Sequence, residues 1–160
     1  MRLVIAAVGR LKSGPEADLI ADYAARIKAG GKALGITDFS ISEVEAPKGL
    51  EGVQRQSREG ELLAAALPDS GWRIALDERG KELGSAEFAK LIETKRDQGS
   101  PAISFIIGGA DGLVPAIRDS ANSTLAFGKA TWPHMLVRAM LCEQIYRAMT
   151  ILAGHPYHRA

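Results

Sequence analysis

The chain has 160 residues, of which 46% are hydrophobic and 24% are charged, so it suits one compact domain and is neither disordered nor of low complexity. Its longest apolar runs hold only about half a dozen residues, which is too short to span a bilayer and argues against a membrane protein. The formal net charge is +1, but residues 129–160 carry four cations against one anion, together with all three histidines. An anionic partner is therefore expected near the C-terminus.

Short apolar runs alternate along the chain with segments of helical period. In chain order, the predicted elements are a strand at 3–8, a helix at 15–28, a strand at 37–45, a helix at 50–67, a strand at 72–76 ending at Asp77, a helix capped by Ser85 and running to Thr94, a strand at 102–107, a helix at 115–121 and a strand at 124–127. This order predicts an α/β fold with a mainly parallel sheet covered by helices on both faces. No repeat or linker divides the chain, so residues 1–160 are expected to form a single domain.

The last predicted helix, Pro133–Leu152, is apolar in nearly every direction around its axis. Such a helix must be buried on all sides, which predicts that one face lies on the sheet and another meets a second copy in a two-fold dimer. A core helix of a monomer is the alternative. Cys142 in its middle is interpreted as a packing residue, and a single cysteine favours a cytoplasmic location. Glu143 and Arg147 have the spacing of a helix-surface ion pair.

Five residues, Gly108–Gly112, follow the most strand-like run and precede a helix. This is where α/β proteins place ligands, and glycines let a backbone approach a ligand closely. The Gly-Gly-x-x-Gly spacing matches neither the dinucleotide fingerprint nor a Walker loop. A ligand loop and a tight strand-to-helix turn both explain it.

A second constellation, residues 127–134 (FGKATWPH), joins a short strand to the last helix. It can flank a flat heterocycle with apolar side chains and offer backbone groups to its edge. A hydrophobic staple at a helix start is the alternative explanation.

The tail, residues 155–159 (HPYHR), is rich in side chains that stack on bases, pair with phosphate and exchange protons near neutral pH. A metal site at His155 and His158 would be short of ligands, so no metal is expected. A merely solvated polar tail is the alternative.

Four segments together resemble the signature segments of the RlmH family, the ribosomal RNA large subunit methyltransferases H: residues 105–113 (FIIGGADGL), 127–134 (FGKATWPH), 143–148 (EQIYRA) and 155–159 (HPYHR). The resemblance runs over the full chain. It implies a SPOUT-class α/β enzyme whose C-terminal part, about residues 102–160, is threaded as a trefoil knot, binds the cofactor and forms a homodimer. The family transfers a methyl group from S-adenosyl-L-methionine to N3 of a pseudouridine in the helix 69 loop of 23S rRNA, on assembled ribosomes.

The resemblance also implies residue roles. The positions that match the family's cofactor site are Leu76, Gly108, Phe127, Gly128, Lys129, Ala130, Thr131 and Trp132. Those that match its catalytic residues, which the tail brings across the dimer, are Glu143, Tyr157, His158 and Arg159. Methyl transfer needs no metal, and the tail histidine or a water could take the N3 proton. We expect Gly108→Val to block the cofactor by filling the space that its close approach requires.

Two other classes of function remain open from the residues alone. One is a non-catalytic dimeric RNA-binding protein that uses the basic C-terminal region without a cofactor. The other is a small-molecule nucleotide-binding α/β enzyme that uses the glycine loop and needs no RNA. The nearly neutral net charge favours the second over binding of free RNA, unless the substrate is recognised by shape on the ribosome.

Overall fold

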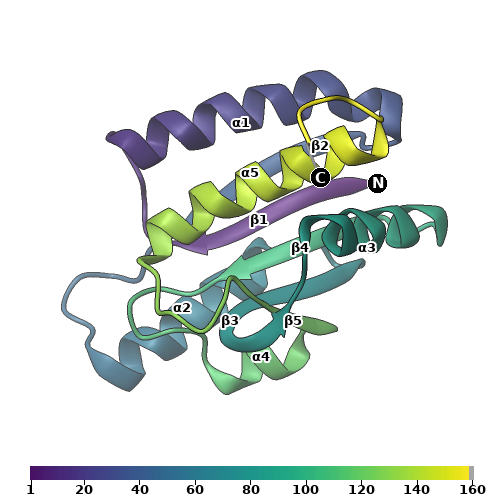
Figure 1. Cartoon of the computed structure of the whole chain (residues 1–160). Coiled ribbons are helices and arrows are strands. Elements are labelled where there is room, and N and C mark those ends of the chain that lie inside the picture. Colours follow the sequence, from purple (N-terminus) through teal and green to yellow (C-terminus); the bar gives the residue numbers. More distant parts are fainter. Residues whose placement is uncertain (159–160) are drawn as a thin grey trace.

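A computed structural model describes residues 1–158, in which five strands form one sheet with helices against both faces (Figure 1). In chain order the elements are β1 (Arg2–Val8), α1 (Pro15–Gly31), a short 3-10 turn (Lys32–Leu34), β2 (Asp38–Val44), α2 (Gly52–Ala66), β3 (Trp72–Glu82), α3 (Ser85–Asp97), β4 (Ala102–Ile107), α4 (Pro115–Ser120), β5 (Ser123–Ala126) and α5 (His134–Leu152). The predicted alternation of strands and helices is confirmed.

The sheet has the strand order β2-β1-β4-β3-β5, and every neighbouring pair is parallel. All five strands therefore end at the same edge, where the connections to the following helices begin. The predicted α/β class with a parallel sheet is confirmed. The trefoil knot that the family resemblance implies stays a prediction.

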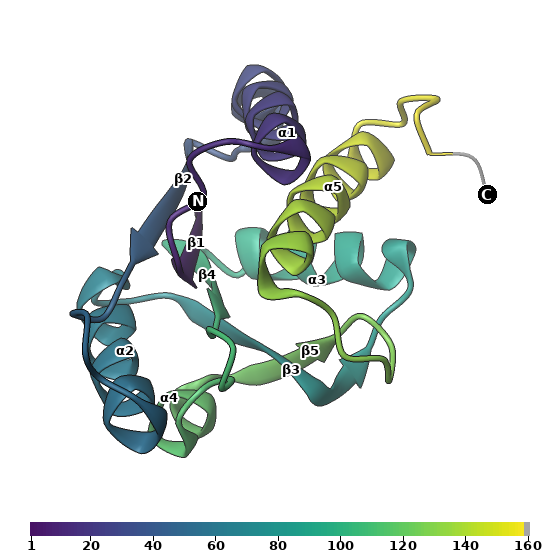
Figure 2. The same cartoon turned by 90° about the vertical axis from the view of Figure 1, so that its left-hand side faces the viewer.

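The two faces of the sheet carry separate hydrophobic clusters, because successive side chains of a strand point to opposite sides. Ile5 and Phe105 belong to the cluster beneath α1, α3 and α5, whereas Ala6 and Ile106 belong to the cluster beneath α2 and α4. Figure 2 shows these two helix layers on opposite sides of the strands. Strand β4, central in the sheet, is buried along its whole length.

Two boundaries differ from the sequence prediction. Strand β3 continues to Glu82 instead of ending at Asp77, because the chain bulges outward after Leu76 and then resumes pairing with β5. The N-cap of α3 is Gly84 and not Ser85: the Gly84 N–H donates to the Glu87 carboxylate at 2.8 Å. The Ser85 hydroxyl instead donates to Gln144 on α5 at 2.9 Å, which ties two helices together.

Helix α5 lies between α1 and α3, over the middle of the sheet (Figure 2). Its inner side is fully buried, and burial raises the pKa of the Cys142 thiol to about 12, which confirms the packing role. Leu136 and Met140 are only partly buried, so the protomer does not enclose the helix on every side. The dimer that would cover this side stays a prediction. None of the helices within residues 1–158 has the length and hydrophobicity needed to cross a bilayer.

Arg138 anchors α5 to the end of β1 and is completely buried. Its Nη2 donates to the carbonyls of Val8 and Gly9, both at 3.0 Å, and its Nη1 pairs with Glu43 on β2 at 2.6 Å. Burial lowers the pKa of the guanidinium, while the Glu43 carboxylate opposes that shift. One side chain thus fixes the start of α5 over two strand ends.

Arg138→Leu is expected to lower the free energy of unfolding by about 3 kcal/mol, because it removes the donor to two strand-end carbonyls and the cation that pairs with Glu43. Urea denaturation followed by circular dichroism measures this. The control is Arg10→Leu, which removes an exposed ion pair with Glu45 and is expected to cost less than about 1 kcal/mol. Equal losses in the two variants would contradict the anchoring role.

Candidate active site

A cleft of about 920 Å³ opens at the carboxyl ends of β3, β4 and β5. Three connections wall it: the β3 bulge (residues 77–80), the glycine loop (residues 108–112) and the β5–α5 loop (residues 127–133). Strand-end clefts of this kind are the usual ligand sites of parallel α/β sheets, and the volume suits a nucleoside-sized ligand.

The β3 bulge requires a glycine at Gly80, because a Cβ there would lie 2.7 Å from the backbone of Leu125. The bulge carries Asp77 to the cleft wall, where its carboxylate accepts two hydrogen bonds from the Arg79 guanidinium at 2.8 Å each. This pairing with Arg79 lowers the pKa of Asp77 to about 2. Asp77 therefore stays ionised on the cleft wall at any physiological pH, paired with Arg79.

The glycine loop turns back tightly on itself. A Cβ on Gly108 would lie 2.6 Å from the carbonyl carbon of Gly112, so the loop's own backbone excludes a side chain there. This packing is one reason for a glycine at this position, and the expected close approach of a cofactor stays a prediction. Gly112 has a φ of +74°, and its Cβ direction is open. The two glycines are thus required for different reasons, close packing at Gly108 and positive φ at Gly112.

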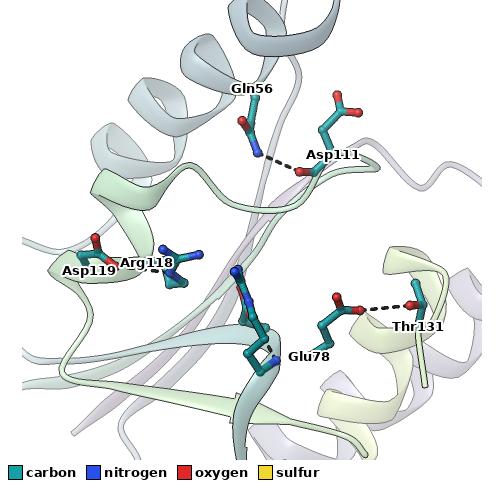
Figure 3. Close-up of polar contacts among 8 residues, drawn as sticks. Gln56, Glu78, Asp111, Arg118, Asp119 and Thr131 are labelled. Carbon is teal, nitrogen blue, oxygen red and sulfur yellow. Dashed lines mark hydrogen bonds and ion pairs between the residues drawn. The ribbon is translucent and has the colours of Figure 1, made fainter. Parts of the chain in front are cut away.

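Helix α2 holds the glycine loop from outside. Gln56 donates to the Asp111 carbonyl at 2.7 Å (Figure 3). Arg55 pairs with the Asp111 carboxylate. Glu59 is buried against Gly109, and its Oε2 has no hydrogen-bond partner within residues 1–158. Burial raises the pKa of this carboxyl group. The sequence analysis did not identify these α2 residues, because a polar helix face looks the same whether it faces solvent or a loop fifty residues away.

The β5–α5 loop closes the remaining wall. Trp132 Nε1 donates to the Phe127 carbonyl at 2.9 Å, and the Thr131 hydroxyl donates to Glu78 of the β3 bulge at 3.0 Å (Figure 3). Next along the chain, His134 also lines the cleft, and burial, with the nearby Arg138 cation, lowers its pKa. Both effects favour the neutral form of the His134 imidazole.

Most of the residues expected to bind a cofactor lie together on this cleft. Those that line it are Leu76, Gly108, Phe127, Gly128, Ala130, Thr131 and Trp132. Lys129 is exposed and does not line it. Two of the three walls, the glycine loop and the β5–α5 loop, were thus predicted from sequence, whereas the charged residues of the β3 bulge were not.

Among residues 1–158, the expected catalytic residues Glu143, Tyr157 and His158 do not line the cleft of their own protomer. Glu143 lies halfway along α5, and the chain beyond that helix folds back so that the Tyr157 hydroxyl donates to Glu143 at 3.2 Å (Figure 1). Arg147 pairs with the same carboxylate at 2.9 Å, which confirms the predicted ion pair. His158 is partly buried, and Arg159 lies outside the described residues. Within residues 1–158, no cluster of three or more His, Cys, Asp or Glu side chains could hold a metal ion.

The fold and the cleft define a parallel α/β protein with a strand-end site for a nucleoside-sized ligand. Two solved structures have the same fold: a probable methylase family protein from Haemophilus influenzae (TM-score 0.52, 13% identity, 99% of this chain and 70% of that one) and a putative methylase family protein from Neisseria gonorrhoeae (TM-score 0.50, 12% identity, 99% and 87%). At these identities the likeness concerns the fold alone.

Sequence comparison is more specific. Residues 1–158 match the family model described as "Predicted SPOUT methyltransferase". Two relatives are named ribosomal RNA large subunit methyltransferase H. The one from Xanthobacter autotrophicus is 53% identical to this chain over the whole of both, and the one from Paracoccus denitrificans is 54% identical over 99% of both. The chain therefore belongs to the SPOUT methyltransferases, and within them to the ribosomal RNA large subunit methyltransferase H family.

Gly108→Ala is expected to destabilise the protein and abolish ligand binding in the cleft, because the methyl group collides with the Gly112 backbone and must open the loop. Gly112→Ala is expected to cost only about 1–2 kcal/mol, since its strain is that of positive φ in open space. Thermal unfolding of the two variants compares these effects. A milder effect at Gly108 than at Gly112 would contradict the packing argument.

The Asp77–Arg79 pair is expected to stabilise the fold above about pH 4 and to lose that contribution as the pH falls toward 2. The pair stabilises the folded protein at higher pH because the pKa of Asp77 in the folded protein, about 2, lies below its ordinary value of 3.8. Asp77→Asn should therefore have a lower melting temperature than the parent protein at pH 5, and the two melting temperatures should converge near pH 2. A difference that stays constant across this range would rule out the ion pair as the cause.

Proposed function

We propose that this chain is an S-adenosyl-L-methionine-dependent methyltransferase that acts as a cytoplasmic homodimer on N3 of a pseudouridine in the helix 69 loop of 23S rRNA, within assembled ribosomes. The end-to-end identity of about half with ribosomal RNA methyltransferases supports the reaction class. The observation that carries the proposal is the cleft, two of whose three walls are segments on which the family resemblance rests.

The residues of the cleft fit this cofactor. Leu76, Phe127 and Trp132 offer apolar surfaces to the adenine ring, and the backbone of the β5–α5 loop offers hydrogen-bonding groups to its edge. The carboxylates of Asp77 and Glu78 suit a ligand that carries a sulfonium and an ammonium group. When bound, the cofactor supplies a methyl group that is already activated for transfer.

The remaining task of the protein is to hold the target nitrogen in line with the methyl carbon and to accept the N3 proton. As the bond from carbon to N3 forms and the bond from carbon to sulfur breaks, the N3 proton passes to a base such as His158 or a water. Tyr157 serves as a hydrogen-bond donor, because burial, with Tyr23 and Glu143 nearby, raises the pKa of its hydroxyl. Arg159 is proposed to hold a phosphate or the anionic base.

The position of the tail supports a shared active site. Glu143, Tyr157 and His158 lie away from the cleft of their own protomer, so their catalytic role requires the cleft of a second one. The partly buried side of α5, which includes Leu136 and Met140, is the proposed contact between the two copies. The C-terminal part, about residues 102–160, is proposed to be the knotted region that binds the cofactor and forms the dimer.

Truncation after Pro156 is expected to abolish methylation and to leave the affinity for S-adenosyl-L-methionine within a few-fold, because the cleft walls remain intact. The assay uses a cofactor with a tritiated methyl group and purified ribosomes that lack the modification, with mapping of the labelled nucleotide. Calorimetry measures cofactor binding. Loss of cofactor binding together with methylation would contradict a role of the tail in catalysis alone. Label on a different nucleotide would overturn the proposed substrate.

Mixed dimers test whether the tail acts across the interface. The truncated chain is combined with Ala130→Trp, which keeps the tail but fills the cleft from an exposed position on its wall. A mixed dimer then has one intact cleft facing an intact partner tail, and activity is expected to reappear although each parent is inactive. No recovery would place the tail in the cleft of its own protomer.

A further inference from the structure

A cluster of aromatic and charged side chains surrounds the tail, and helix α1 contributes to it. The Tyr23 hydroxyl of α1 lies 3.3 Å from the Tyr157 hydroxyl, which in turn donates to Glu143 at 3.2 Å. The ring of Tyr146 packs edge-on against Tyr157 at 4.8 Å between centroids. These contacts join an N-terminal helix to residues more than a hundred positions later in the chain.

The direction of the hydrogen bonds follows from the number of protons. A tyrosine hydroxyl carries one proton, and that of Tyr157 is used toward the Glu143 carboxylate, which can only accept. Tyr23 must therefore donate to the oxygen of Tyr157. Arg147 donates to the same carboxylate oxygen of Glu143. The hydrogen bonds therefore run from Tyr23 through Tyr157 to a carboxylate that is paired with a guanidinium.

Tyr23 itself is held in place from two directions. Its ring lies 5.9 Å from that of Tyr146, and the guanidinium of Arg26 lies over both rings at 5.7 and 5.6 Å. Arg26 is fixed in turn by Asp22, one helical turn earlier, at 2.8 Å. A side chain ordered in this way can orient a neighbour without moving itself.

We propose that Tyr23 is a positioning residue for catalysis: its hydroxyl fixes the orientation of the Tyr157 phenol, and with it the tail that completes the partner's cleft. This inference rests on the proposed function of the tail. It extends the active site to α1, which belongs to neither the cleft nor the tail.

The test is Tyr23→Phe, which removes the hydroxyl and keeps the ring that packs on Tyr146. Turnover of methyl transfer to ribosomes is expected to fall about five- to tenfold, which corresponds to the loss of one hydrogen bond. The cofactor dissociation constant and the melting temperature are expected to stay close to those of the parent. Lys28→Gln, an exposed change on the same helix, is the matched control and should leave turnover unchanged.

A double-mutant cycle separates positioning from simple packing. In a Tyr157→Phe background there is no hydroxyl to orient, so adding Tyr23→Phe is expected to have no further effect on turnover. Unchanged turnover in Tyr23→Phe, or a loss that persists in full in the Tyr157→Phe background, would overturn the inference. If the parent protein itself transfers no label to ribosomes, the proposed function fails instead, so the two failures are distinguishable.

Discussion

The parallel direction of all five strands is the constraint on which the rest of the structure depends. It puts the ends of β3, β4 and β5 at one edge, so three connections that are far apart in sequence wall one cleft. The sheet does not by itself fix the shape of these loops. That is done by a few close contacts, such as Gly80 against Leu125 and Gln56 on the Asp111 carbonyl. Backbone direction thus gives the location of the site, and local packing gives its form.

The elements could be predicted from sequence because their signals are local. Apolar periodicity and glycine positions mark nearly every strand and helix to within a few residues, and the spacing of Glu143 and Arg147 is enough to predict their ion pair. The continuation of β3 could not be predicted in this way, since it depends on pairing with β5 some forty residues later. Likewise, the polar side chains of Arg55 and Glu59 give no indication that they face a loop and not solvent.

Helix α5 separates two halves of the proposed chemistry. Its 19 residues span about 28 Å, with His134 at the cleft and the tail beyond the other end. A helix of this length keeps its two ends far apart, so the tail could reach the cleft of its own protomer only if the chain ran back along the helix. The tail is instead held beside α1 through Tyr23. The geometry of one protomer therefore favours an active site that is completed by a second copy.

The distribution of charge leads to the same arrangement. Around the cleft each guanidinium is matched by a carboxylate of the same protomer: Arg55 with Asp111, and likewise Arg79 with Asp77 and Arg118 with Asp119. Paired charges produce little field at a distance, so the cleft alone attracts a polyanion weakly. The excess of cations belongs to residues 129–160, with four against one anion. Of these cations, Arg138 and Arg147 pair with Glu43 and Glu143, whereas Lys129 lies exposed in the β5–α5 loop beside the cleft. In the proposed dimer the partner's tail would add Arg159 near this lysine, so the positive charge that attracts a polyanion would gather where the two protomers meet.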